Sequence, residues 1–304
     1  MDLTTTLCGI ELPNPVMPAS GTFGFGYDMA RWYELDCLGA LCIKGATKEA
    51  RYGNPQPRIA ECEGGLLNAI GLQNPGVEAI ISEELPRLRN FYKGPVIANI
   101  SGFSTEEYVY VAEKFDEDPN TALLELNISC PNVHGGGMAF GTDATCAAGV
   151  VSAVKKAVKK PVLVKLSPNV SDIVAIALAC ESAGADGLVL INTLLGMRID
   201  PRRGKPIVST GASGFSGPAI KPVALRMVYE VCSKVHIPVV GVGGIADPDD
   251  VLEFLAAGAV AVQVGSQNLV DPFACKNIIE TLPLLLQAYG LGSVKSAIGR
   301  AQDA

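Results

Sequence analysis

The sequence predicts an α/β fold: a (β/α)8 TIM barrel with long loop insertions over its C-terminal rim, formed by one domain that spans residues 1–304. Eight short apolar runs rich in valine and isoleucine recur along the chain, and longer amphipathic stretches separate them. Strands of a parallel sheet that is buried on both faces read as such runs. The length also suffices, since a barrel takes about 250 residues as a single unit. An open, doubly wound parallel sheet is the structural alternative.

The predicted strands are residues 14–20, 40–45, 95–101, 123–129, 161–167, 187–193, 238–244 and 261–266. Helical patterns lie between them, among them residues 218–235 and residues 171–185, for which Ser171 is the expected N-cap. The strands end in polar residues or glycine: Ser20, Lys44, Asn99, Asn127, Lys165, Asn192, Gly243, Gly244, Gly265 and Ser266. Because the carboxyl ends of barrel strands share one rim, where active sites are built, we expect these residues to surround the functional site.

Lys165 is the most unusual of these residues. Apolar residues alternate with polar ones in its strand and in the strand before it, which places Asn127 and Lys165 inside the barrel. A lysine in a central strand is costly to bury without compensation, so we expect an anionic or electron-rich partner beside it. A structural ion pair with the inward-facing Glu125 is the alternative.

Three connections on the same rim are too long to be simple turns: residues 45–73, 130–142 and 194–216. Long loops on an active face usually cover a ligand. The basic residues of the third connection, which include Arg202 and Arg203, fit a solvated loop better than a phosphate site.

Glycines at the last two strand ends indicate a phosphate-bearing cofactor. They occur in GVGGI (241–245) and VGSQN (264–268), and Gly217 stands ahead of another helix. Many barrels hold a phosphate at this place, where backbone N–H groups approach the ligand closely. No G-x-G-x-x-G follows the first strand, so a Rossmann dinucleotide site is not indicated.

Cys130 is the leading candidate for a catalytic base or nucleophile. It lies just past a strand end in NISCPN (127–132), at the foot of a glycine-rich loop. The chain has two histidines. His134 is in that loop and fits a solvent-exposed position, whereas His236 precedes the seventh strand and therefore belongs to the opposite face.

Composition limits the function classes. The net charge is −7, which gives no diffuse attraction to nucleic acid or anionic lipid. No apolar run reaches the ~18 residues of a membrane helix, and the first residues, MDLTTTLCGIELPNP, show no basic region followed by an apolar one, so a cytoplasmic protein is expected. The nine cysteines are odd in number and irregularly spaced, as expected of reduced thiols. Cys37 and Cys42 have the spacing that opens an iron–sulfur motif, but Gly45 stands where the next ligand would fall, so no metal is expected on this chain.

The motifs as an ordered set resemble dihydroorotate dehydrogenase of class 1 over nearly the whole chain. They are ASGTFGFG (19–26), IKGAT (43–47), NAIGLQNPG (68–76), NISCPN, VKLSPN (164–169), INT (191–193), SGPAIKP (216–222), GVGGI and VGS (264–266). Cys130 marks class 1, because class 2 enzymes have serine as the base. NAIGLQNPG resembles the catalytic subunit of the NAD-linked subclass 1B. TGASGFSG and VGSQN depart from the family pattern, and we expect altered loop detail and one altered phosphate contact.

The resemblance implies an oxidoreductase acting on a CH–CH bond that converts (S)-dihydroorotate to orotate in pyrimidine (UMP) biosynthesis, with one FMN per chain. Cys130 would remove the C5 proton as a thiolate while a hydride passes from C6 to flavin N5. The implied flavin contacts are Ser20, Lys44, Gly45, Asn99, Asn127, Lys165, Ile191, Gly217, Gly243, Gly244, Gly265 and Ser266. The implied substrate contacts are Lys44, Asn68, Ala69, Ile70, Gly71, Leu72, Asn127, Asn132, Asn192 and Thr193.

The resemblance also implies a partner. Electrons would pass to NAD through an iron–sulfur flavoprotein that carries FAD and a [2Fe–2S] cluster, in a heterotetramer of two copies of each chain around a homodimer core. Three alternatives stay open: a fumarate-dependent class 1A enzyme, another FMN barrel oxidoreductase such as a tRNA dihydrouridine synthase, and a flavin-free phosphate-binding barrel lyase or isomerase. The net charge of −7 disfavours the RNA-binding alternative.

Overall fold

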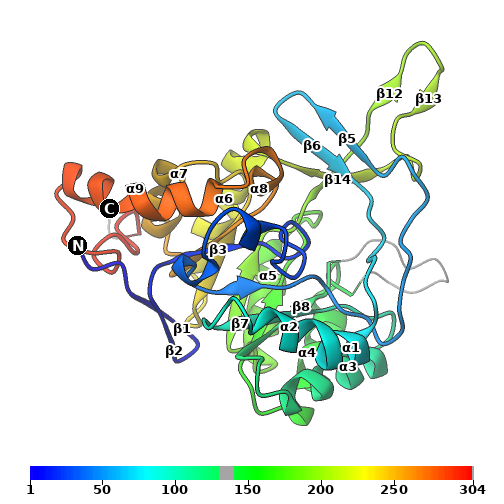
Figure 1. Ribbon diagram of the computed structural model, residues 1–304, viewed down its shortest axis with the longest axis horizontal. Helices are drawn as coiled ribbons and strands as arrows, with labels where there is room; N and C mark the ends of the chain where they lie inside the picture. The colour runs from blue at the N-terminus through cyan, green and yellow to red at the C-terminus, as the bar shows by residue number, and fades with distance from the viewer. Residues whose placement is uncertain (130–139, 303–304) are drawn as a thin grey trace.

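An eight-stranded parallel sheet forms the centre of the protein in a computed structural model, which describes residues 1–129 and 140–302 (Figure 1). The strands follow the order β3, β16, β15, β10, β9, β8, β7, β4. Their bounds are β3 Val16–Pro18, β4 Leu41–Cys42, β7 Val96–Ile100, β8 Leu123–Asn127, β9 Val162–Lys165, β10 Gly187–Leu190, β15 Val239–Val242 and β16 Ala261–Val264. Each lies within one of the eight predicted ranges.

The sheet closes between its first and last strands. The backbone N–H of Gly39, just ahead of β4, donates to the carbonyl oxygen of Val16 in β3 at 2.9 Å. Only glycine fits at this seam, because a Cβ at Gly39 would lie 2.2 Å from the carbonyl oxygen of Asn14. The predicted (β/α)8 barrel is therefore confirmed, and the open-sheet alternative is wrong.

Helices follow the strands and cover the outside of the barrel. Their bounds are η1 Met29–Arg31, η2 Leu35–Cys37, α1 Val77–Ala79, η3 Ile80–Glu84, α2 Leu85–Leu88, α3 Thr105–Glu117, α4 Ala144–Ala157, α5 Ile173–Ser182, η4 Pro218–Ile220, α6 Lys221–Cys232, α7 Pro248–Ala256, α8 Gln267–Val270 and α9 Ala274–Ala288. The outward side chains of the strands, such as Leu124 and Val164, are fully buried in the layer between strands and helices. No helix among the described residues is long and apolar enough to cross a membrane, and the cytoplasmic location stays a prediction.

Side-chain caps start several of these helices. The Ser104 hydroxyl accepts a hydrogen bond from the backbone of Glu107 at the start of α3. The prediction of Ser171 as the cap of α5 is wrong, since the carboxylate of Asp172 accepts from the backbone N–H of Ala175 at 3.0 Å. Both residue types cap helices, and the extended backbone lies at Asp172.

The N-terminal hairpin closes the bottom of the barrel. Strands β1 (Thr5–Leu7) and β2 (Ile10–Leu12) pair antiparallel, and Leu7 and Leu12 are fully buried among the inward residues of the barrel strands. The Thr5 hydroxyl donates to the carbonyl oxygen of Val260 at 2.8 Å, which ties the hairpin to the last barrel strand. The amino-terminal end of the barrel is thus filled by apolar side chains.

Two of the predicted long connections meet over the opposite rim. They form a four-stranded antiparallel sheet in the order β11, β14, β6, β5, which projects from the barrel with the small β12–β13 hairpin (Figure 1). The bounds are β5 Ile59–Cys62, β6 Gly65–Asn68, β11 Leu194–Gly196, β12 Ile199–Asp200, β13 Lys205–Pro206 and β14 Ser213–Ser216. Arg202 and Arg203 are exposed at the turn of the hairpin, as predicted for a solvated loop. Most of the remaining predicted connection, 130–142, lies outside the described residues, because residues 130–139 are not described.

The seam at Gly39 gives a test of barrel closure. We expect Gly39→Ala to lower the free energy of unfolding by about 1–3 kcal/mol or more, because the new methyl group forces the β3 backbone away. Gly149→Ala, the same substitution on the exposed face of α4 where a Cβ meets nothing within 4 Å, should raise it by about 0.5–1 kcal/mol. Denaturant unfolding of both variants measures the difference. Equal effects at the two positions would contradict a steric closure.

Candidate active site

A pocket of about 540 Å³ lies at the carboxyl ends of the barrel strands, beneath the antiparallel sheet. Its lining comes from the strand ends and from both insertions. A concave pocket of this size, with apolar walls and a few convergent polar groups, is typical of a site for a cofactor or small substrate.

The pocket brings together every described residue that the resemblance implicates. The implied flavin contacts that line it are Ser20, Lys44, Gly45, Asn99, Asn127, Lys165, Ile191, Gly217, Gly243, Gly244, Gly265 and Ser266. The implied substrate contacts that line it are Lys44, Asn68, Ala69, Ile70, Gly71, Leu72, Asn127, Asn192 and Thr193. Which ligand each residue contacts stays a prediction.

Three residues from the sequence analysis lie outside the described residues: Cys130, Asn132 and His134. The other histidine, His236, is exposed and precedes β15, at the opposite end of the barrel from the pocket. Its backbone N–H donates to Glu181 Oε1 at 2.6 Å. His236 therefore lies on the face, away from the pocket, that its position in the sequence predicts.

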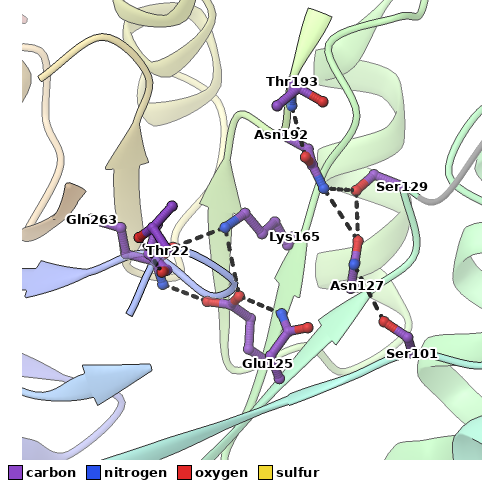
Figure 2. A network of polar contacts seen from close by, with 11 residues as sticks. Thr22, Ser101, Glu125, Asn127, Ser129, Lys165, Asn192, Thr193 and Gln263 are labelled. Carbon is purple, nitrogen blue, oxygen red and sulfur yellow. Dashed lines mark hydrogen bonds and ion pairs between the residues drawn. The ribbon is translucent and has the colours of Figure 1, made fainter. Parts of the chain in front are cut away.

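A buried charge cluster forms the floor of the pocket (Figure 2). Lys165 Nζ lies 3.7 Å from Glu125 Oε1 and 3.0 Å from Gln263 Oε1. Asn99 Nδ2 donates to Glu125 Oε1 at 2.7 Å, and Gln263 Nε2 donates to the other carboxylate oxygen. The predicted ion pair with Glu125 therefore exists, yet Lys165 also lines the pocket, so the pair leaves the lysine facing the ligand space.

Hydrogen-bonded amides form one wall (Figure 2). Asn192 Nδ2 donates to Asn127 Oδ1 at 3.2 Å and to the Ser129 hydroxyl, which in turn donates to Asn127 Oδ1 at 2.8 Å. Asn127 Nδ2 lies 3.3 Å from the Ser101 hydroxyl. Amides held in this way present donors and acceptors in fixed directions to a ligand.

Sequence reasoning missed three residues of the site. Ser129 and Asn169 line the pocket, and Gln263 completes the floor. Asn169 Nδ2 donates to the carbonyl oxygen of Thr193 at 3.0 Å and fixes the strand end beside it. Ser129 and Asn169 stand in the motifs NISCPN and VKLSPN, and Gln263 stands in the predicted strand 261–266, where the alternation of side chains would have placed it inside the barrel.

The glycines at the ends of β15 and β16 form an open cradle. Gly244 has a φ of +73°, and a Cβ there would lie 2.9 Å from the carbonyl oxygen of Gly217. A Cβ at Gly265 would meet nothing within 4 Å among the described residues, so open space lies before it. In the described part of the chain, the N–H groups of Gly244, Gly265 and Ser266 form no backbone hydrogen bond. Such free N–H groups fit the phosphate of a flavin mononucleotide.

Lys44 is the second cation of the pocket. Its ammonium group forms no hydrogen bond or ion pair with any described residue. Burial lowers the pKa of its ammonium group below the ordinary value, and the nearby Arg58 guanidinium lowers it further. A partly buried lysine without a counter-ion favours an anionic ligand, which would restore the charge balance.

Comparisons with known proteins all indicate the same family. The family model described as Dihydroorotate dehydrogenase matches residues 2–286. A relative from Geobacillus kaustophilus (strain HTA426) is 58% identical over 299 residues, which cover 98% of this chain and 95% of the relative. Relatives from Bacillus caldolyticus and Fusobacterium nucleatum subsp. nucleatum are 57% and 54% identical over 98% of this chain and 95% and 98% of their own lengths. All three are named dihydroorotate dehydrogenase B (NAD(+)), catalytic subunit.

Lys44 gives a test that needs no ligand. Since its pKa is lower in the folded than in the unfolded chain, the charged lysine destabilises the ligand-free fold below its folded-state pKa. We expect Lys44→Met to raise the melting temperature by a few degrees at pH 7. The gain should vanish above about pH 10.4, the unfolded-state pKa of lysine. Thermal melts across this range measure it, with Lys234→Met at an exposed position as the control. A lower melting temperature for Lys44→Met at pH 7 would refute the argument.

Proposed function

Because the chain belongs to the dihydroorotate dehydrogenase family, we propose that it is the FMN-containing catalytic subunit of an NAD-linked dihydroorotate dehydrogenase of subclass 1B. The proposed reaction is the oxidation of (S)-dihydroorotate to orotate in pyrimidine biosynthesis. The observation that carries the proposal is the pocket in which the buried Lys165, the partly buried Lys44, the amide wall and the glycine cradle meet. Separately, these features occur in many proteins, but together they suit a flavin beside a small anionic ring.

The residues present fit FMN. Gly244, Gly265 and Ser266 would hold its phosphate with their free N–H groups, and Lys165 would face the electron-rich edge of its ring system. When bound, FMN supplies the acceptor for the hydride of the substrate. The fixed ammonium group of Lys165 would stabilise the negative charge that the ring gains.

The substrate side is matched by the remaining polar groups. Lys44 lacks a counter-ion among the described residues, so we assign it to the dihydroorotate carboxylate. Asn127 and Asn192 would hold the ring, whose edge presents alternating N–H and C=O groups that an amide matches as donor and acceptor. Asn68, fixed by a bond from its Nδ2 to the carbonyl oxygen of Gly214 at 3.4 Å, would contact the ring from the antiparallel sheet.

We assign the base to Cys130. It follows Ser129, which lines the pocket, although Cys130 itself lies outside the described residues. Its thiolate would take the proton from C5 of the substrate while the hydride leaves C6. An unperturbed thiol has a pKa of about 8.5, so a hydrogen-bonding or positive surrounding is needed for it to ionise at neutral pH.

The base assignment predicts a specific kinetic defect. Cys130→Ala should keep FMN bound but slow flavin reduction by dihydroorotate by about 10²–10⁴-fold, the usual contribution of a positioned base. Cys130→Ser should retain some activity at higher pH, because a hydroxyl ionises less readily. Stopped-flow bleaching of the flavin measures both rates, with Cys146→Ala on α4 as a thiol-deletion control. Near-normal reduction in Cys130→Ala would assign the base to another group, and no reduction in the unaltered protein would refute the proposed activity.

We propose that a second protein would carry the electrons of the reaction to NAD. The relatives are named catalytic subunits of an NAD(+) enzyme, a name that implies a further subunit. This chain has no Rossmann fingerprint after its first strand. We therefore propose a partner that carries FAD and a [2Fe–2S] cluster, in a heterotetramer of two copies of each chain around a homodimer core.

The isolated chain should reduce dyes or oxygen with dihydroorotate but should not reduce NAD. Addition of the iron–sulfur flavoprotein should restore NAD reduction. Steady-state assays with each acceptor measure this, and the dye serves as the control for an active catalytic site. Efficient fumarate reduction by the chain alone would assign it to class 1A, and NAD reduction without a partner would contradict both subclasses.

A further inference from the structure

Below the pocket, the barrel encloses a cluster of buried polar side chains. The cluster contains two amide side chains in addition to the two members of the ion pair. Glu125 and Gln263 are fully buried, and Lys165 is 5% exposed. They come from β8, β16 and β9, with Asn99 from β7 beside them. Among the described residues, the apolar layer of the hairpin and the lower strands covers this set from below, and Lys165 and Asn99 line the pocket above it.

The Glu125 carboxylate is held in one orientation. Asn99 donates to Oε1 at 2.7 Å, and Gln263 donates to Oε2. The Cys42 thiol also lies against the carboxylate, and burial together with the neighbouring Glu125 raises the pKa of that thiol well above its ordinary value. Cys42 therefore stays neutral, and the cluster contains one carboxylate and one ammonium group.

The ion pair itself is open. The 3.7 Å between Lys165 Nζ and Glu125 Oε1 exceeds the length of a hydrogen bond, whereas Lys165 Nζ lies 3.0 Å from Gln263 Oε1. The Gln263 amide thus bridges the two charges, since its oxygen accepts from the lysine and its nitrogen donates to the carboxylate. An ammonium group has three donors, so Lys165 keeps donors for the pocket.

We propose that Gln263 and Glu125 are positioning residues that hold Lys165 short of a closed ion pair and so determine how strongly the pocket favours reduced over oxidised flavin. This inference rests on the proposed FMN site and goes beyond it, because it assigns control of the flavin to two residues beneath the pocket. A carboxylate in direct contact with Lys165 would neutralise the charge that stabilises the reduced ring. The amide bridge prevents that contact.

Two variants close the pair in different ways. In Gln263→Met, an apolar side chain of similar length replaces the bridge, so Lys165 is free to move onto Glu125. In the exchange variant Glu125→Gln/Gln263→Glu, the net charge is unchanged. The carboxylate then stands at position 263, where Lys165 Nζ already has its hydrogen-bond acceptor at 3.0 Å. In both, we expect the affinity for reduced FMN to fall about tenfold relative to that for oxidised FMN, the size of one charge-assisted hydrogen bond.

The measurement is the midpoint potential of FMN bound to each variant, followed spectroscopically, with the dissociation constant of oxidised FMN determined in parallel. Asp186→Asn is the matched control, because it removes the carboxylate of another lysine pair, Lys155–Asp186, which does not line the pocket. A thermal melt of each variant tests whether that variant folds. If Gln263→Met does not fold, the exchange variant alone decides the question.

A cycle with Lys165→Met separates positioning from a general structural role. When Lys165 is already replaced, Gln263→Met should not lower the potential further. An unchanged potential in either folded variant, or the same shift without Lys165, would overturn the inference. If the unaltered protein binds FMN and the variants show the expected shifts in potential, but the protein does not oxidise dihydroorotate, the proposed reaction alone is refuted. A protein that takes up no FMN would refute the cofactor and this inference together.

Discussion

The desolvation of two opposite charges inside a closed barrel constrains the whole upper half of this structure. Glu125 is fully buried and Lys165 nearly so, and a buried charge is tolerated only when hydrogen bonds and an opposite charge compensate it. The amides of Asn99 and Gln263 provide those hydrogen bonds from two further strands. Side chains from four strands, β7, β8, β9 and β16, thus meet around one carboxylate. Their contacts fix how these strands are aligned, and therefore also where the residues at the ends of the strands lie.

The side chains inside the barrel form two layers, an apolar layer that stabilises the fold and a polar layer that lines the pocket. The lower layer is apolar and is sealed by Leu7 and Leu12 of the hairpin, so it resembles the core of any globular protein. The layer above it is polar and opens into the pocket, where residues from the strand ends meet residues of the antiparallel sheet. Since the two insertions pair with each other as β6 and β14, the roof of the pocket is built from segments far apart in the sequence.

Local patterns predicted the barrel well because each strand carries its own signal. All eight strands, and the strand-end residues around the pocket, follow from apolar runs and the residues that end them. The pairing of β6 with β14 was beyond such reasoning, because it depends on long-range contacts between two irregular insertions. Whether Ser171 or Asp172 caps α5 depends on the backbone conformation of a single residue, which the sequence does not reveal. The position of the Gln263 amide between Lys165 and Glu125 depends on the directions of side chains from several strands. The roles of Cys130 and Asn132 still rest on the sequence alone.

The hairpin at the bottom of the barrel imposes an order on folding. Thr5 bonds to Val260, and the Cys8 thiol donates to the carbonyl oxygen of Asp186 at 3.2 Å, so the hairpin contacts segments that are synthesised long after it. Contacts of such large sequence separation form late, because the chain between them must be ordered first. Leu7 and Leu12 therefore reach their full burial only after the last strand, which contributes Ala261 to the same cluster, has been made. Until then the two leucines lack part of their native cover, and apolar surface that is exposed in a folding intermediate favours aggregation, so the first segment to leave the ribosome is among the last to be fully packed.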